Sequence, residues 1–241
     1  MAGHNKWSKV KNIKGVADAK RSKVWTKIIR EITVAARMGG IDPAGNPRLR
    51  KALEDARTNN LAKEPVQRAM AKASGKEDTG DYEELTYEGY GPAGVAILVS
   101  CLTDNRNRTY SEVRTAFNKN GGNLGTPGSV AFGFQKKGLI LLAKVDNQNL
   151  NEDKILESGL EAGLEEFSDE EEGFSITCTP ETLLDLRTAL EAHQINIASA
   201  DIAMVSDNPI ELSMEHSETL SELIEALEDL DDVQKVWTSA K

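Results

Sequence analysis

The feature that most constrains this chain is an abrupt division of charge along its length. Residues 1–80 carry 11 Lys and 7 Arg against 8 acidic residues, a net charge of +10. Residues 81–241 carry 11 basic and 31 acidic residues, a net charge of −20. Such an asymmetry favours a nucleic-acid-binding end joined to an acidic remainder that keeps the protein soluble.

Length and composition narrow the class of protein further. A chain of 241 residues is long enough for two or three domains. It has no apolar run near the ~20 residues of a membrane span, and no apolar segment behind its basic start as in a secretory signal. Cys101 and Cys178 lie far apart in apolar stretches, which is typical of reduced, buried thiols. We therefore expect a cytoplasmic protein, and a monomer, although the sequence does not define the oligomeric state.

The first 80 residues predict a bundle of helices. Residues 14–38 have helical periodicity that ends at Gly39-Gly40, a pair suited to a C-terminal cap. Asn46-Pro47 predicts the start of a second helix, and Pro65 lies near the start of a third that ends at Gly75. Residues 74–81 have no periodicity and are predicted to be a linker.

The rest of the chain alternates between strand and helix patterns. This alternation predicts an α+β protein with helices on one face of small sheets. Strands are expected at 95–102, 129–134, 139–145, 174–178 and 233–238, helices at 111–120, 152–167, 182–193 and 220–230, and a mixed segment at 195–205.

The first predicted helix has two different faces. At about 100° per residue, one arc of about 140° collects apolar side chains and a nearly opposite arc collects cations. The cations lie about one turn, near 5 Å, apart, a spacing that suits successive phosphates. The apolar arc holds Val24, Trp25, Ile28, Ile29, Ile32, Ala35 and Ala36, and the cationic arc holds Lys20, Lys23, Lys27, Arg30 and Arg37. Arg21, on the same helix, is a further candidate contact.

A basic segment precedes this helix, with one tryptophan among closely spaced lysines. Such an arm can follow a phosphate backbone while its aromatic ring stacks on a base. The alternatives are that Trp7 docks on the bundle and that the whole basic run is a solvated helix face with a frayed terminus. The candidate contacts are Lys6, Trp7, Lys9, Lys11 and Lys14.

Two loops are further candidates for binding. Residues 103–109 offer Arg106 and Arg108 for phosphate contacts, although their Asp and Asn residues are equally typical of a turn and helix cap. Residues 121–129 are Gly-rich, and their backbone amides can cradle an anion. They lack both the Gly-Lys-Ser/Thr ending of a P-loop and the dinucleotide fingerprint. A shaped connection is the better interpretation of this second loop.

No arrangement of residues in the sequence indicates an enzyme. The three histidines have no metal-ligand spacing with cysteine or with each other, and no nucleophile motif or redox cysteine pair is present. The acidic run at 165–172 is typical of a solvated turn. We expect neither a catalytic residue, nor a bound metal, nor a cofactor.

Several motifs resemble the YebC family of probable transcriptional regulators, which includes a mitochondrial translational activator of cytochrome oxidase subunit synthesis. The resemblance implies a helical bundle at 1–80, a middle α/β domain formed by 81–134 plus 207–241, and a ferredoxin-like α+β domain inserted at 135–206. The motifs are Met1-Ala-Gly-His-Asn-Lys-Trp-Ser-Lys9, Asp18-Ala-Lys-Arg-Ser-Lys23, Tyr87-Glu-Gly-Tyr-Gly-Pro92, Leu102-Thr-Asp-Asn-Arg-Asn-Arg-Thr109, Asn120-Gly-Gly-Asn-Leu-Gly125 and Gly128-Ser-Val130.

Three functions remain open at the level of sequence. The first is a DNA-binding transcriptional regulator. The second is a ribosome-associated translation factor that binds ribosomal RNA through the same basic surface. The cationic row lacks the Asn, Gln and Arg mixture of a base-reading helix, which favours recognition of backbone and shape. The third is a protein-interaction adaptor that uses the acidic domains.

Overall fold

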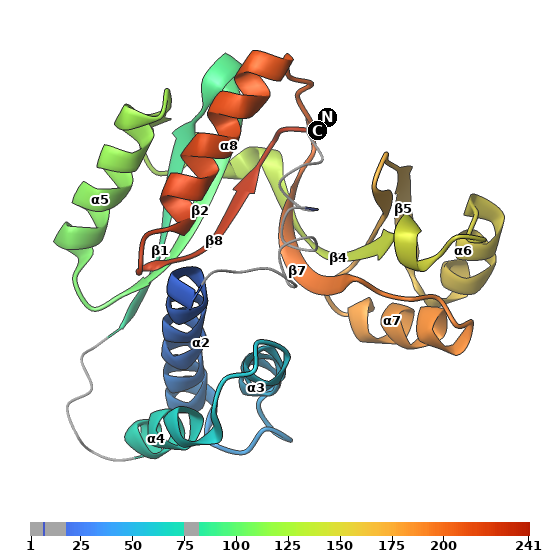
Figure 1. Ribbon diagram of the computed structural model, residues 1–241, viewed down its shortest axis with the longest axis horizontal. Coiled ribbons are helices and arrows are strands. Elements are labelled where there is room, and N and C mark those ends of the chain that lie inside the picture. Colours follow the sequence, from blue (N-terminus) through green and yellow to red (C-terminus); the bar gives the residue numbers. More distant parts are fainter. Residues whose placement is uncertain (1–6, 8–17, 75–81) are drawn as a thin grey trace.

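The protein consists of a three-helix region followed by two four-stranded antiparallel sheets, each covered by helices on one face (Figure 1). The computed structural model describes Trp7, residues 18–74 and residues 82–241. The three helices are α2 (Asp18–Gly39), α3 (Pro47–Thr58) and α4 (Lys63–Ser74). The α+β class predicted from the sequence is therefore confirmed.

Asn46 fixes the turn between α2 and α3. Its side-chain oxygen accepts from the Leu49 amide at 3.0 Å, which caps α3 as predicted. Its Nδ2 donates to the carbonyls of Ala35 and Gly40 at the end of α2. Most of the predicted apolar arc of α2, from Ile28 to Ala36, packs in the centre of the bundle against the inner faces of α3 and α4. Trp25, also in that arc, is only half-buried outside this core, and its Nε1 donates to the Asn59 carbonyl at 2.9 Å. The buried core is Ile32, Ala35, Ala36, Leu49, Ala52, Ala56 and Ala69.

The first sheet, sheet A, has the strand order β3-β1-β2-β8. Its strands are β1 (Glu83–Tyr90), β2 (Ala96–Thr103), β3 (Asn123–Leu124) and β8 (Val233–Thr238). Helices α5 (Arg106–Lys119) and α8 (Met214–Glu228) cover one face (Figure 1). Alternate residues of β2 point toward these helices, where Ile97, Val99 and Cys101 are buried with Phe117 and Leu223.

The second sheet, sheet B, has the strand order β5-β6-β4-β7. Its strands are β4 (Phe134–Ala143), β5 (Leu164–Asp169), β6 (Gly173–Cys178) and β7 (Ser199–Ser206). Helices α6 (Glu152–Gly159) and α7 (Leu183–Ala192) cover one face, over a core that includes Ile140, Ile155, Ile176, Leu186 and Leu190.

The chain builds sheet B before it has completed sheet A. The chain leaves sheet A after β3, completes all four strands of sheet B, and returns to form α8 and β8. Strand β8 pairs with β2, so sheet A combines segments that come before and after sheet B in the sequence. Where the sheets meet, Leu98, Val130 and Phe134 are buried, and Met204 and Trp237 pack against them.

Three sequence predictions were wrong in detail. Strand β1 was not predicted, because its short alternating pattern contains three glutamates and a glycine, residue types that are depleted in strands. Residues 129–134, predicted as a strand, contain a 3-10 helix at Ala131–Gly133. The helix predicted at 152–167 ends near Gly159, and Gly163 adopts a positive φ of 95° that turns the chain into β5.

Trp7 covers the face of sheet B opposite its helices. The ring is 2 % exposed and packs against Leu141 and Ala143. Its Nε1 donates to the Glu170 carboxylate at 2.8 Å. Trp7 therefore docks on sheet B rather than on the helical bundle, and in this structure its ring faces protein.

Trp7→Ala should lower the free energy of unfolding by about 3 kcal/mol, the usual cost of removing a buried aromatic ring. Trp7→Phe should cost less, because it keeps most of the apolar contact and loses only the bond to Glu170. Urea unfolding followed by circular dichroism measures both. Unchanged stability in both variants would show that the ring does not occupy this place in solution.

Candidate nucleic-acid interface

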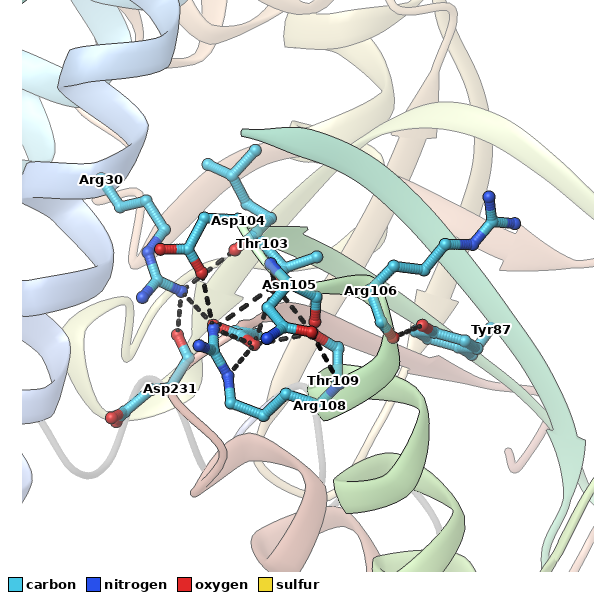
Figure 2. Close-up of polar contacts among 11 residues, drawn as sticks. Arg30, Tyr87, Thr103, Asp104, Asn105, Arg106, Arg108, Thr109 and Asp231 are labelled. Carbon is cyan, nitrogen blue, oxygen red and sulfur yellow. Dashed lines mark hydrogen bonds and ion pairs between the residues drawn. The ribbon is translucent and has the colours of Figure 1, made fainter. Parts of the chain in front are cut away.

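A buried carboxylate, Asp232, joins three parts of the protein just after α8. Its side chain is 2 % exposed. It accepts from the Thr109 hydroxyl at 2.7 Å, the Thr103 hydroxyl at 3.0 Å and the Arg108 guanidinium at 2.8 Å. Arg30 of α2 reaches the same carboxylate at 2.8 Å. Figure 2 shows the partners Arg30, Thr103, Arg108 and Thr109 close together at the N-terminal end of α5.

The turn at residues 103–105 directs Arg108 toward this carboxylate. The Asn105 side chain accepts from the Arg108 amide at 3.0 Å and caps α5, and the Asn105 amide donates to the Thr103 hydroxyl at 2.9 Å. The guanidinium of Arg108 also binds Asp104 at 2.9 Å. Residues 103–109 thus form the turn and helix cap that is one of the two interpretations of this segment.

The charge of Asp232 is stabilised in the folded state. Burial by itself raises the pKa of this carboxyl. Hydrogen bonds from Thr109, Arg108 and Thr103, with the nearby charge of Arg30, outweigh burial and hold the pKa below its ordinary value. The ionised carboxylate is therefore the form that the fold requires.

Three cations of the predicted phosphate-binding row contact the chain's own residues 228–232. Lys23 Nζ lies 2.6 Å from the Asp229 carboxylate, and Lys27 Nζ donates to the Glu228 carbonyl at 2.5 Å. Arg30 additionally donates to the carbonyls of residues 102 and 231 at 3.0 and 2.7 Å. Because the end of a helix leaves carbonyls without intrahelical donors and carries partial negative charge, the C-terminus of α8 suits a row of cations.

Ionic contacts also connect α3 to both sheets. Arg48 binds Glu31 of α2 at 2.5 Å and Glu84 of β1. Further along α3, Lys51 lies 3.9 Å from Asp201 of β7, and Glu54 lies 3.3 Å from Arg187 of α7. The inner sides of α2 and α3 thus hold the three-helix region against the rest of the protein.

The remaining predicted site residues lie apart from one another. Arg21 and Arg37 are exposed near opposite ends of α2. Arg106 is exposed, and its guanidinium extends away from the Asp232 cluster (Figure 2). Lys6, Lys9, Lys11 and Lys14, and the side chain of Lys20, lie outside the described part of the protein.

Four cations that the sequence reasoning did not single out lie on the outer surfaces of α3 and α4. Arg50, Arg57, Lys63 and Lys72 are exposed, and none makes an ion pair within residues 21–73 and 82–241. Arg50 and Arg57 are seven residues apart and so share one side of α3. The same helical projection that was applied to α2 would have identified this pair.

A carboxylate already occupies one amide of the Gly-rich loop, that of Gly128, and two amides that directly follow the loop. Glu88 is buried and accepts from the amides of Gly128, Val130 and Ala131 at 2.5–2.8 Å. Burial raises the pKa of Glu88, but these three bonds outweigh burial and lower it. The loop is therefore a shaped connection, as expected, whose potential anion cradle binds the protein's own side chain.

The described ranges contain no group of three or more His, Cys, Asp and Glu side chains placed to hold a metal ion. They also contain no helix with the length and apolarity needed to cross a membrane.

Both cysteines are buried thiols, and burial raises the pKa of Cys101 to about 12. This thiol is therefore not suited to act as a nucleophile.

Two family models together match nearly the whole chain. The model of the TACO1/YebC protein N-terminal domain matches residues 5–76, and that of the TACO1/YebC second and third domain matches residues 82–240. The chain belongs to the TACO1/YebC family. The family resemblance proposed from the sequence motifs is confirmed.

Relatives with regulatory names are similar over almost the full length. A probable transcriptional regulatory protein of Geobacter sulfurreducens is 48 % identical over 239 residues, 99 % of this chain and 95 % of that protein. One from Francisella philomiragia is 50 % identical over 240 residues, with 99 % and 95 % covered. A conserved hypothetical protein of Aquifex aeolicus, known from a crystal structure, is 41 % identical, with a TM-score of 0.80 and 93 % and 91 % of the chains covered. Membership of this regulatory family confirms that the chain is not an enzyme.

Asp232→Asn should lower the free energy of unfolding at pH 7 by about 3 kcal/mol, because it removes the charge that Arg30 and Arg108 contact. The depressed pKa means that this stability is present above the unfolded value near 3.9. It is lost as the pH falls through the lower folded value. The gap between the variant and the wild type should therefore narrow below about pH 4. Urea unfolding from pH 7 to pH 3 measures the gap, and a gap independent of pH would contradict this account.

Proposed function

We propose that this protein regulates gene expression by binding nucleic acid through its basic three-helix region. The observation that carries the proposal is a set of exposed cations on the outer surfaces of α3 and α4 that make no ion pair within residues 21–73 and 82–241: Arg50, Arg57, Lys63 and Lys72. They lie in the part of the chain whose net charge is +10. Cations that do not pair within the protein are free to neutralise phosphates and release counterions.

The inner row of α2 has a different role in this proposal. Lys23, Lys27 and Arg30 contact residues 228–232, and the side chain of Arg30 is only 13 % exposed. We assign these three cations to holding the three-helix region in place. Phosphates reach them only by displacing those contacts, so the outer surfaces of α3 and α4, with the lysines of residues 6–14, form the primary contact.

The target is duplex DNA or structured RNA. The names of the bacterial relatives favour transcription and hence DNA. The second candidate is a ribosome-associated translation factor that binds a structured RNA through the same outer cations, because contacts of cations with phosphates need no particular base sequence. The third, an adaptor that acts through the acidic domains, would bind its partner without residues 1–80. Each version places the protein in the cytoplasm.

The domain division belongs to the same proposal. Sheet A combines segments that come before and after sheet B in the sequence. This supports a middle domain of 81–134 plus 207–241 and an inserted domain of 135–206. Sheet B and its helices follow one another in the order β-α-β-β-α-β, which supports a ferredoxin-like arrangement for the insert.

Two sets of charge variants test which cations bind. The outer set changes Arg50, Arg57, Lys63 and Lys72 to Gln. The inner set, the control, changes Lys23 and Lys27 to Gln, and its effect is compared per charge removed. Binding of duplex DNA and of a structured ribosomal RNA fragment is measured by fluorescence anisotropy from 50 to 300 mM salt. The outer set should weaken binding more than 10-fold and reduce the salt slope by about 2–4.

The inner set should change affinity less than 3-fold but lower the stability of the protein. An inner set that weakens binding as strongly as the outer set would contradict the assignment of roles. Absence of binding by the wild-type protein to either ligand would overturn the proposed function. Comparison of the two ligands then separates the DNA and RNA versions.

A further inference from the structure

Helix α5 differs in charge from the other helices of the acidic part of the chain. It contains four basic residues and one acidic residue, a net charge of +3. The described helices α6, α7 and α8 have net charges of −2, −1 and −5. The cations of α5 are therefore a local exception within residues 81–241, whose net charge is −20.

One flank of α5 combines two of these cations with two aromatic rings. Arg106, Tyr110 and Arg114 are spaced by four residues and so lie one above another on the helix. All three are exposed, and the ring of Tyr110 lies 6.2 Å from that of Tyr87 on β1, at 50°. The Tyr87 hydroxyl donates to the Arg106 carbonyl at 3.4 Å (Figure 2). Tyr110 thus lies between the two arginines on the helix, and Tyr87 lies next to both Tyr110 and Arg106.

The acidic groups near this flank do not neutralise it. Asp104 binds Arg108 at 2.9 Å, and Glu112 projects from the other side of α5, about 160–200° around the helix from Tyr110 and Arg114. Glu84 binds Arg48. Glu83 is exposed, but it lies four residues from Tyr87, about 13 Å along the strand. Arg106 and Arg114 make no ion pair within the described ranges, 21–73 and 82–241.

We propose that this flank, formed by Tyr87, Arg106, Tyr110 and Arg114, is a second contact surface that binds unpaired nucleotides of a single-stranded nucleic acid. The inference rests on the proposed function and extends it to a second site and a class of ligand. Guanidinium groups bind phosphates, while a tyrosine ring that is 45 % exposed offers a face on which a base stacks. A base inside a duplex is already stacked on its neighbours, so this surface favours single strands and loops.

The test compares oligonucleotides of one mixed sequence, 12 nucleotides long, as single-stranded RNA, single-stranded DNA and blunt duplex DNA. Tyr110→Ala should weaken single-strand binding about 10-fold, whereas Tyr110→Phe, which keeps the ring, should retain the affinity of the wild type. The double variant Arg106→Gln with Arg114→Gln should weaken it about 10-fold and reduce the salt slope. Lys119→Gln, on the opposite flank of α5, is the matched control and should change affinity less than 2-fold.

Each outcome decides the inference separately from the proposed function. If the wild type binds and the outer variants of α3 and α4 weaken binding while the α5 variants do not, only the second surface is wrong. If the α5 variants weakened the binding of single-stranded and duplex oligonucleotides equally, the assignment to unpaired bases would be overturned. Displacement of the oligonucleotide from the α5 flank by poly-glutamate at equal charge concentration would overturn it in favour of an acidic protein partner. Tighter binding of single-stranded RNA than of single-stranded DNA would support the proposed surface and identify RNA as its ligand.

Discussion

The contact between Arg30 and Asp232 is the interaction on which the arrangement of this protein depends. A carboxylate that is 2 % exposed requires cationic and hydrogen-bonding partners, because an unpaired buried charge is strongly destabilising. Thr103 at the end of β2 and Arg108 and Thr109 in the first turn of α5 supply partners. Arg30 supplies the remaining one from α2, and in doing so it fixes the three-helix region to sheet A.

This arrangement gives the cations of the basic region two roles. Those on the inner sides of α2 and α3 are matched by carboxylates and helix-end carbonyls of the acidic part of the chain. Those on the outer sides of α3 and α4 have no such partner among the described residues. The division of charge along the sequence therefore serves docking within the molecule as well as an outward basic surface.

Much of the fold could be predicted because it depends on local patterns. Asn46 caps its helix as predicted, Ile32, Ala35 and Ala36 of the apolar arc of α2 are buried, and β8 has the predicted limits. The interface could be predicted only in part, because the partners of Lys23, Lys27 and Arg30 lie about 200 residues away in the sequence. A helical projection identifies a cationic face, but it does not identify what the face contacts. For the same reason neither the docking of Trp7 on sheet B nor the use of the loop amides by Glu88 could be foreseen.

A double-mutant cycle between Arg30→Ala and Asp232→Asn tests the central contact most directly. The free energy of unfolding is measured for the wild type, both single variants and the double variant. A parallel cycle pairs Asp232→Asn with Arg114→Ala, on the outer flank of α5. The account predicts a coupling above about 1 kcal/mol for Arg30 with Asp232 and additive effects for the parallel pair. Additive effects in both cycles would show that α2 is not held by this carboxylate.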